Sequence, residues 1–390
     1  ENARTFSDIA NGKYIQVHGH RSVDTKITLA PGVHDINGGL GNNGNLFALK
    51  VTNSGHSIFE ITNTHIDLCN PREITQLPDS PNDAIASIME NKNINKNEFG
   101  DIVSLNFKRS VFYSRKWNEL SIKARGLFVN KNSKNIVARS YDKFFNLNEF
   151  ESHTMVNLIH TVKFPVKEFK KENGYLGIVG YDVEHSKVLY CSKSSLNGEH
   201  AKWLRKLLEP AEVFLNGFLA GGEYSLVFEV CLPEEDPHII EYSEPRLYLL
   251  DIVENQIKFK SLPDIESFIT KLRKHGVNVY AKELISVAEN AEDLIRNVHN
   301  TKSVQYEGGV YVDSNNFMFK VKSDYYTKWK QLRSYKDTKL YNSSIKVSAL
   351  AFDTEAFEFL SWCKRTYTQE EAKHKSIIRL RKEFYGQSEK

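Results

Sequence analysis

The 390-residue sequence lacks paired cysteine motifs, long apolar runs and a P-loop, and each absence excludes a class of protein. Its four cysteines, Cys69, Cys191, Cys231 and Cys363, are far apart and form no CxxC pair. This spacing argues against a zinc ribbon or a disulfide framework, and predicts a reducing compartment such as the cytoplasm, with the nucleus left open. No run approaches the roughly 18 apolar residues of a membrane helix, so we expect no membrane partner. The Gly-rich stretch at 38–44 lacks Gly-Lys-Ser/Thr and is not a P-loop.

The chain also lacks a strong charge of one sign. Lysine and arginine number 52 against 49 aspartate and glutamate, a net charge of +3, so any nucleic-acid site must be a local patch. With 40% hydrophobic residues, the chain is long enough for a sizeable core and for two or more domains. It begins at Glu1 rather than Met, and we expect a fragment of a longer polypeptide.

Residues 1–63 are expected to form a small β-rich segment, with strands at Tyr14–Val17, Asn45–Val51 and Ser57–Ile61. The block His18-Gly19-His20 after the first strand resembles the closing segment of calcineurin-like metallophosphatases, where such a histidine is a metal ligand. A two-metal site needs further Asp, His and Asn ligands, and no such blocks occur here. Either an upstream phosphatase or kinase domain belongs to the same polypeptide, or these are ordinary turn histidines.

The rest of the chain divides into three parts by composition. Residues 64–104 are polar and contain Pro71, Pro78 and Pro81, which predicts a linker with a short helix near Asp83–Met89. Residues 105–323 show short alternating strands with interspersed helices, and residues 324–390 show a helical pattern. The predicted strands include Thr161–Val166, and the predicted helices include Pro263–Lys274 and Ala281–Val298. Basic and aromatic residues mix at 107–117.

One stretch, Lys170 to Gly177, carries the candidate chemistry. Lys171 precedes Asn173-Gly174 by two residues, between two expected strands, as a nucleophile held on a turn would. Glycine lets the backbone approach a ligand closely, and asparagine can hold a ribose or a metal-bound water. A Lys-rich hairpin turn would have the same sequence, so these residues alone leave both interpretations open.

Other short blocks occur on both sides of this stretch in a fixed order. They are Lys123-Ala124-Arg125-Gly126, the run from Ala138 to Asn146, Lys171-Glu172-Asn173-Gly174, Cys191-Ser192-Lys193-Ser194, Leu226-Val227-Phe228-Glu229, Glu307-Gly308-Gly309-Val310 and Phe319-Lys320-Val321-Lys322. In this order the blocks resemble the nucleotidyltransferase domain of ATP-dependent RNA ligases. The resemblance is to the phage-type RNA ligase 1 family and the ligase module of fungal tRNA ligases.

This resemblance implies a reaction with two adenylylated intermediates. A lysine attacks the ATP α-phosphate to form lysyl-AMP, AMP passes to an RNA 5′-phosphate, and a 3′-hydroxyl then displaces AMP. By position, the resemblance makes Lys171 the nucleophile, with Lys170 as the alternative. The attacking amine must be neutral, so its pKa of about 10.4 has to fall by roughly 3 units. We expect nearby cations and a divalent metal to lower it.

The resemblance also assigns roles to the other blocks. Arg125 and Lys143 match positions that bind the triphosphate, and Lys193, Lys320 and Lys322 are the candidate cations near the nucleophile. Glu229 and Glu307 match acidic positions near the ribose and a metal, Mg²⁺ or Mn²⁺. Asn173 and Phe228 are candidates for the nucleotide pocket. Each has an ordinary alternative: solvated strand lysines, surface carboxylates, or, for Phe228, the core. Tyr242 and Tyr248 are weaker candidates that could only pack.

Three departures separate this chain from the families it resembles. The phage-type signature has Asp where this chain has Asn173, which favours the fungal branch. Gly308-Gly309 replaces a more usual single glycine followed by a bulkier residue. The fungal segment that recognises a terminal 2′-phosphate has two arginines, whereas only Arg333 matches here and Lys330 replaces the other. Lysine cannot form the planar fork of arginine, so we expect weak discrimination for a 2′-phosphate.

We therefore expect an α+β fold, a ligase-type nucleotidyltransferase domain at 105–323 with antiparallel sheets around an ATP cleft. A helical C-terminal domain at 324–390 is expected to bind RNA with Lys373, Lys375, Arg379, Arg381 and Lys382. The predicted activity is ATP-dependent sealing of broken RNA such as tRNA, within a larger healing-and-sealing protein. The alternatives are a protein adenylyltransferase that uses the same lysyl-AMP, and a non-catalytic module that binds RNA ends.

Overall fold

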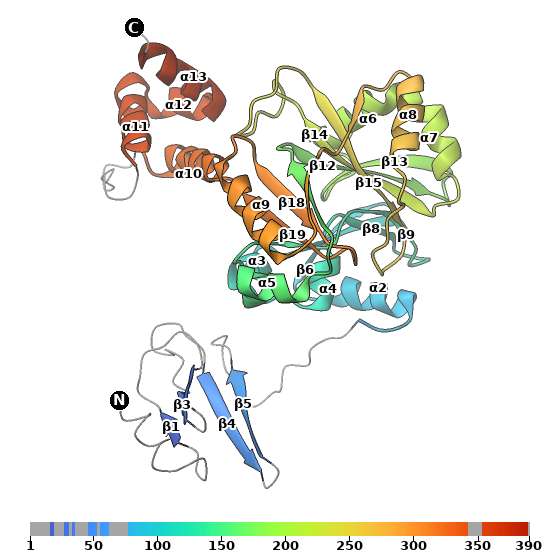
Figure 1. The fold of residues 1–390 in the computed structure, drawn as a ribbon. Coiled ribbons are helices and arrows are strands. Elements are labelled where there is room, and N and C mark those ends of the chain that lie inside the picture. The colour runs from blue at the N-terminus through green and yellow to red at the C-terminus, as the bar shows by residue number, and fades with distance from the viewer. Residues whose placement is uncertain are drawn as a thin grey trace. The chain divides into compact units, whose positions relative to one another are not determined.

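The computed structural model describes residues 16–18, 27–30, 33–35, 46–52, 55–61, 77–341 and 353–388. The chain divides into two compact units, Glu1–Ile74 and Thr75–Lys390, each described by itself (Figure 1). No helix among the described residues is long and apolar enough to cross a membrane.

The first unit contains only strands within its described residues. They are β1 (Gln16–His18), β2 (Ile27–Ala30), β3 (Val33–Asp35), β4 (Leu46–Thr52) and β5 (Gly55–Ile61). Three of them form a sheet of order β1-β3-β2, and β4 pairs antiparallel with β5. The β-rich character predicted from the sequence is confirmed. The side chain of His18 and the whole of His20 lie outside the described residues, so the resemblance to a metallophosphatase stays a prediction.

The second unit begins with a helix and a four-stranded antiparallel sheet. Helix α2 (Pro81–Glu90) is capped by the Ser80 side chain and matches the predicted short helix. The sheet runs in the order β6 (Ile94–Phe99), β7 (Ile102–Phe107), β8 (Leu127–Asn130) and β9 (Ile136–Arg139). Within the predicted linker 64–104, residues 94–99 instead form the strand β6. It is an edge strand that buries little beyond Ile94, and edge strands accept polar side chains.

Two five-stranded sheets form the centre of the unit. One has the order β10-β19-β18-β11-β17 and the other the order β13-β12-β14-β15-β16. The first comprises β10 (Phe145–Asn146), β11 (Val166–Lys171), β17 (Leu284–Ala288), β18 (Gly308–Val312) and β19 (Met318–Lys322). The second comprises β12 (Tyr175–Asp182), β13 (Lys187–Ser192), β14 (Tyr224–Cys231), β15 (Arg246–Glu254) and β16 (Val279–Ala281). Most neighbouring strands are antiparallel, as the sequence predicts.

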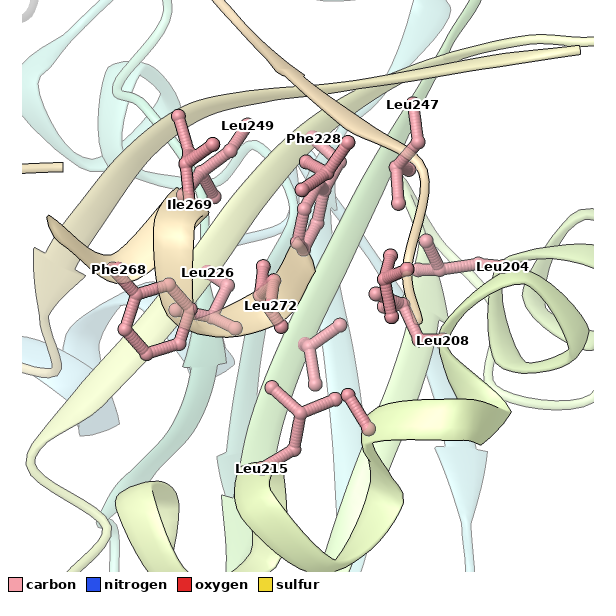
Figure 2. Packing of buried hydrophobic residues seen from close by; sticks show 14 of the residues in the cluster. Leu204, Leu208, Leu215, Leu226, Phe228, Leu247, Leu249, Phe268, Ile269 and Leu272 are labelled. Carbon is pink, nitrogen blue, oxygen red and sulfur yellow. The ribbon is translucent and has the colours of Figure 1, made fainter. Parts of the chain in front are cut away.

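The largest core lies between the β12-containing sheet and three helices. These are α6 (Glu199–Leu208), α7 (Glu212–Leu219) and α8 (Glu266–Lys274), which pack on one side of that sheet (Figure 1). Their apolar side chains interdigitate with those of β14 and β15 (Figure 2). The other sheet packs against α9 (Ala291–Ser303), whose Leu294 and Val298 join Tyr311 and Phe319 in a separate cluster.

The remaining helices fill the space around the sheets and form the C-terminal region. They are α3 (Arg109–Ser114), α4 (Glu119–Lys123), α5 (Met155–Thr161), α10 (Asp324–Thr338), α11 (Thr354–Thr366), α12 (Gln369–His374) and α13 (Ile377–Ser388), with short 3-10 turns at Glu151–His153 and Glu209–Ala211. The described part of residues 324–390 is helical, as predicted. The proposed domain boundaries remain predictions.

Three predicted elements are wrong. Thr161–Val166 is not a strand, because α5 is capped by Thr154 and continues to Thr161; β11 starts only at Val166. The predicted helix Ala281–Val298 is the edge strand β17 followed by α9, which Asn290 caps. Short alternating strands were expected within 105–323, yet the residues directly after β7 form the helix α3.

Candidate active site

Lys171, the predicted nucleophile, lies at the junction of the two central sheets. It is the last residue of β11 and is aligned with Gly308 of β18. Tyr175, the first residue of β12, is aligned with Val230 in the other sheet. Residues 172–174 therefore carry the chain from one sheet to the next. The alternative of a Lys-rich hairpin turn is wrong, because β11 pairs with β17 and β18 and not with β12.

Two glycines allow the strands to approach each other at this junction. A Cβ at Gly174 would lie 2.0 Å from the carbonyl oxygen of Val230. Gly308 has a φ of +139°, and a Cβ there would lie 2.0 Å from the carbonyl oxygen of Val321. No side chain fits in either place, and the φ of Gly308 would be strained for any other residue. The backbone conformation at Gly308 therefore explains why the first residue of the unusual Gly308-Gly309 pair is glycine.

Two carboxylates control the charge of Lys171. Its Nζ lies 3.1 Å from Oε2 of Glu307. Burial by itself would lower the pKa of Lys171, but the negative charges of Glu307 and Glu229 outweigh burial and raise the pKa above its usual value. The expectation that nearby cations lower this pKa is wrong for the ligand-free protein.

Asn173 positions Glu307. Its Nδ2 donates to Oε2 of Glu307 at 2.8 Å, and its Oδ1 accepts from the backbone N–H groups of Ile239 (2.9 Å) and Ile240 (3.1 Å). The predicted contact of Asn173 with a ribose or a metal-bound water stays a prediction. An aspartate could accept the same two bonds but, when ionised, could not donate to Glu307. This difference is a physical reason for asparagine at this position.

Tyr242, a weaker candidate in the sequence analysis, holds the same segment. Its hydroxyl donates to Oε2 of Glu172 at 2.7 Å and accepts from the N–H of Asn173 at 2.8 Å. The carbonyl of Ile239 in turn accepts from Nη1 of Arg381 at 3.2 Å. The C-terminal helices thus contact the segment that fixes the residues around Lys171.

A cavity adjoins Lys171 between the two central sheets. Its apolar walls include Phe144, Phe169, Leu176, Leu250, Val310 and Met318. Its charged lining includes Arg125, Lys282, Lys320 and Glu229. A mostly apolar cavity with a few convergent charges is typical of a small-molecule site, and this one suits a flat ring that carries phosphates. Of the residues named here, only Arg125, Lys320 and Glu229 were assigned to the site from the sequence, because only the pairing of distant strands brings the others together.

Arg125 and Lys320 lie at the cavity, as predicted. Nη1 of Arg125 donates to Oγ of Ser140 at 3.4 Å, and its guanidinium carbon lies 5.9 Å from the ring centroid of Phe144. Burial, followed by the charges of Lys143 and Arg125, puts the pKa of Lys320 well below its usual value. Lys322 alternates with Lys320 along β19, and its Nζ lies 4.0 Å from Oε1 of Glu307. Burial lowers the pKa of Lys322 to about 8.

Lys143 and Lys193 do not line this cavity. Nζ of Lys143 donates to the carbonyl of Phe144 at 2.8 Å and lies 3.7 Å from the ring centroid of Phe145. Burial lowers the pKa of Lys143 to about 8, and the charges of Arg125, Lys193 and Lys322 contribute. A positive cluster therefore extends beyond the cavity. The assignment of Lys143 and Lys193 to phosphate binding stays a prediction.

Phe228 is a core residue and not part of the site. It is fully buried with the apolar side chains of α6 and α8 (Figure 2). The next residue on β14, Glu229, lines the cavity. Side chains alternate between the two faces of a strand, so the two cannot both point toward the nucleotide site. The predicted contact of Phe228 with adenine is therefore wrong.

The two candidates for contact with the RNA end lie on α10. Lys330 is exposed, and its Nζ lies 5.7 Å from the ring centroid of Tyr326. Its charge contributes to the low pKa of Lys322, which places it beside the site. Arg333 is half-buried on the same helix. Their role with RNA remains a prediction.

The RNA-binding patch predicted on α12 and α13 is largely occupied by internal contacts. Arg381 is buried, and its guanidinium carbon lies 5.1 Å from the ring centroid of Trp329. Lys375 and Arg379 form ion pairs with Glu383, and Lys382 forms one with Glu241. Lys373 is the exception, with an exposed side chain. Only Arg381 is buried. The side chains of Arg379 and Lys382 are 67% and 61% exposed despite their ion pairs, so RNA binding by this patch stays a prediction.

The site offers few ligands for a metal ion. In residues 77–341 and 353–388, no group of three or more His, Cys, Asp and Glu residues is placed to hold a metal. Glu229 and Glu307 are both close enough to act on Lys171, and Glu229 Oε1 also accepts from the N–H of Gly174 at 2.9 Å. A pair of carboxylates completed by water and substrate phosphates is how proteins commonly bind Mg²⁺. The residues present fit a metal that arrives with a nucleotide.

Comparison with known proteins identifies the class. The model of the RNA ligase family matches residues 123–326, which is more than half of the chain. The chain therefore belongs to the RNA ligase family.

Two curated relatives and one solved structure are among its similar proteins. The tRNA ligase 1 of Schizosaccharomyces pombe is 27% identical over 308 residues, which cover 68% of this chain and 38% of that protein. The tRNA ligase of Candida albicans is 26% identical over 220 residues, which cover 48% and 26%. An archaeal ATP-dependent RNA ligase has a TM-score of 0.46 at 14% identity, covering 77% of this chain and 76% of that one. The chain thus spans well under half the length of these curated relatives.

Proposed function

We propose that this chain is the sealing module of an ATP-dependent RNA ligase, which joins RNA 3′-hydroxyl and 5′-phosphate ends. The observation that carries the proposal is Lys171 itself: it ends β11 beside an apolar cavity, with Glu307 at 3.1 Å. Membership of the RNA ligase family supports the same conclusion.

ATP fits the cavity in chemical terms. Aromatic and aliphatic side chains from both sheets can enclose adenine, and Arg125 and Lys320 supply positive charge for phosphates. Glu229 and Glu307 would hold Mg²⁺ or Mn²⁺. When bound, such an ion would neutralise phosphate charge.

In the first step the Lys171 amine attacks the α-phosphorus of ATP. A P–N bond forms, the bond from the α-phosphorus to the bridging oxygen breaks, and pyrophosphate leaves with its charge balanced by the cations. The lysine must lose a proton, and Glu307 Oε2 lies at hydrogen-bonding distance to accept it. Asn173 and Tyr242 keep Glu307 and Glu172 in place during this step.

In the later steps the RNA ends are the reactants. The RNA 5′-phosphate displaces Lys171 from AMP, and the 3′-hydroxyl then attacks the activated phosphate, releasing AMP. Lys320 and Lys322 would stabilise the negative charge that develops on the departing AMP. Lysine has no bond to make in the last step.

We infer a role in RNA repair, including tRNA, as part of a longer healing-and-sealing protein. The names of the two fungal relatives and the limited share of their length that this chain spans support this inference. A cytoplasmic location, an upstream phosphatase or kinase domain, and weak discrimination for a 2′-phosphate through Lys330 belong to the same proposal.

ATP labelled at the α-phosphate tests the function. The protein should label itself and then pass the label to RNA with a 5′-phosphate, before the label leaves as AMP. Transfer to another protein would instead support an adenylyltransferase. No self-labelling at all would support a module that only binds RNA ends.

A further inference from the structure

Helix α3 and its flanks expose an unusual combination of aromatic and basic side chains. Phe112 is 46% exposed and Tyr113 is 69% exposed, whereas Val111 of the same helix is 2% exposed and anchors it. Arg109 lies against Tyr113, with its guanidinium carbon 5.9 Å from the ring centroid. The helix is therefore anchored by one buried apolar residue, and its two aromatic rings are exposed to solvent.

The charge of this segment is entirely positive. Residues 107–118 contain Lys108, Arg109, Arg115 and Lys116 and no aspartate or glutamate. Across the described parts of the chain, no carboxylate forms an ion pair with any of these four cations. This contrasts with α13, where Glu383 binds two of the basic side chains. The segment keeps its positive charge available to a partner.

The two ends of the segment contact two lysines of the positive cluster, Lys193 and Lys143. Phe107 and Trp117 flank α3, and their ring centroids lie 4.7 Å apart. Nζ of Lys193 lies 4.7 Å from the Phe107 centroid, and Nζ of Lys143 lies 5.0 Å from the Trp117 centroid. The backbone N–H of Phe107 also donates to the carbonyl of Ala124, next to Arg125. The exposed segment is thus continuous with the positive cluster at the cavity.

We propose that residues 108–116 form a platform for the RNA strand beside the nucleotide cavity. This inference rests on the proposed function. Bases of a single strand stack on the exposed rings of Phe112 and Tyr113, while the phosphates meet Arg115 and Lys116. A phosphate backbone matches this surface in charge, whereas a protein partner would need carboxylates at several matching positions. Because ring faces accept any base, the platform binds without base preference.

Two double variants test the platform in the full chain, F112A/Y113A and R115A/K116A. Self-labelling with ATP should be unchanged in both, since neither pair touches the cavity. The KM for a 5′-phosphate RNA should rise about 5- to 100-fold in F112A/Y113A, the range for lost base stacking. In R115A/K116A the dependence of log KM on log salt should become shallower by about 0.7 per cation removed. Val213→Ala and Lys206→Ala, exposed on α7 and α6, are the matched controls.

The outcomes separate this proposal from the proposed function. If the unaltered protein does not label itself with AMP, the proposed function is wrong, and the proposed RNA platform is refuted with it. If it labels itself and seals RNA, but both double variants keep the KM and salt dependence of the controls, the platform alone is overturned. Loss of self-labelling in the double variants would also overturn it, because α3 would then act on the nucleotide step.

Discussion

Replacement of Gly174 by alanine should disable the site by displacing it. The new Cβ would lie 2.0 Å from the Val230 carbonyl oxygen, about 1.4 Å short of ordinary contact. Either β14 or the segment at 172–174 has to move by most of that distance. Overpacking of this kind costs about 1–3 kcal/mol of stability, and a misplacement of about 1 Å at reacting groups costs on the order of 100-fold in rate.

Two other glycines separate displacement of the site from loss of stability. Gly180→Ala creates a similar clash, 2.1 Å from the Val137 carbonyl oxygen, but at the far end of β12. Gly217→Ala on α7 meets nothing within 4 Å and should stabilise the protein by about 0.5–1 kcal/mol. The assay is the rate of self-labelling with ATP per folded molecule, with stability from urea unfolding. The reasoning fails if Gly174→Ala labels within threefold of the unaltered protein, or if Gly180→Ala slows labelling as much.

Three further predictions concern residues around the site. Asn173→Ala removes the acceptor of two backbone N–H groups, one of them fully buried, and should lower the free energy of unfolding by about 2–4 kcal/mol; an unchanged urea midpoint would contradict this. Phe228→Ala removes a core side chain and should lower the free energy of unfolding by about 3–5 kcal/mol, while the KM for ATP stays unchanged. A raised KM would show that the ring contacts the nucleotide after all. Burial lowers the pKa of Lys143 from 10.5 to about 8, so the folded chain binds fewer protons than the unfolded chain between these values and gains stability as pH rises through them. Lys143→Gln should flatten that rise in urea unfolding followed from pH 7.5 to 10.5, and an equally steep rise would show that other groups cause it.

The order of short blocks was enough to predict the family and the general fold. Lys171, Glu229 and Glu307 are separated widely in sequence, yet each belongs to a block whose residue types suit the chemistry. The structure brings all three together, as the carboxylates' effect on the pKa of Lys171 requires. Alternation along β19 also predicted that Lys320 and Lys322 share a face.

Other features depend on long-range pairing, which one sequence does not reveal. The alternating pattern does not reveal which face of β14 lines the cavity, so Phe228 was a candidate for the site together with Glu229. Arg381 looked free because its burial comes from Trp329, which lies on a different helix. The link from Asn173 to Ile239 joins residues 66 apart in the chain. None of these contacts follows from local propensity.

The nucleophilic role of Lys171 is the central claim, and a paired measurement tests it most directly. Lys171→Ala should abolish self-labelling with ATP and joining of a plain 5′-phosphate strand, because the amine forms the first bond. The same variant should retain measurable joining of a strand that already carries AMP, where the 3′-hydroxyl is the nucleophile; this activity also shows that the variant is folded. Near-normal self-labelling by Lys171→Ala would contradict the assignment and make Lys170 the first candidate to replace it.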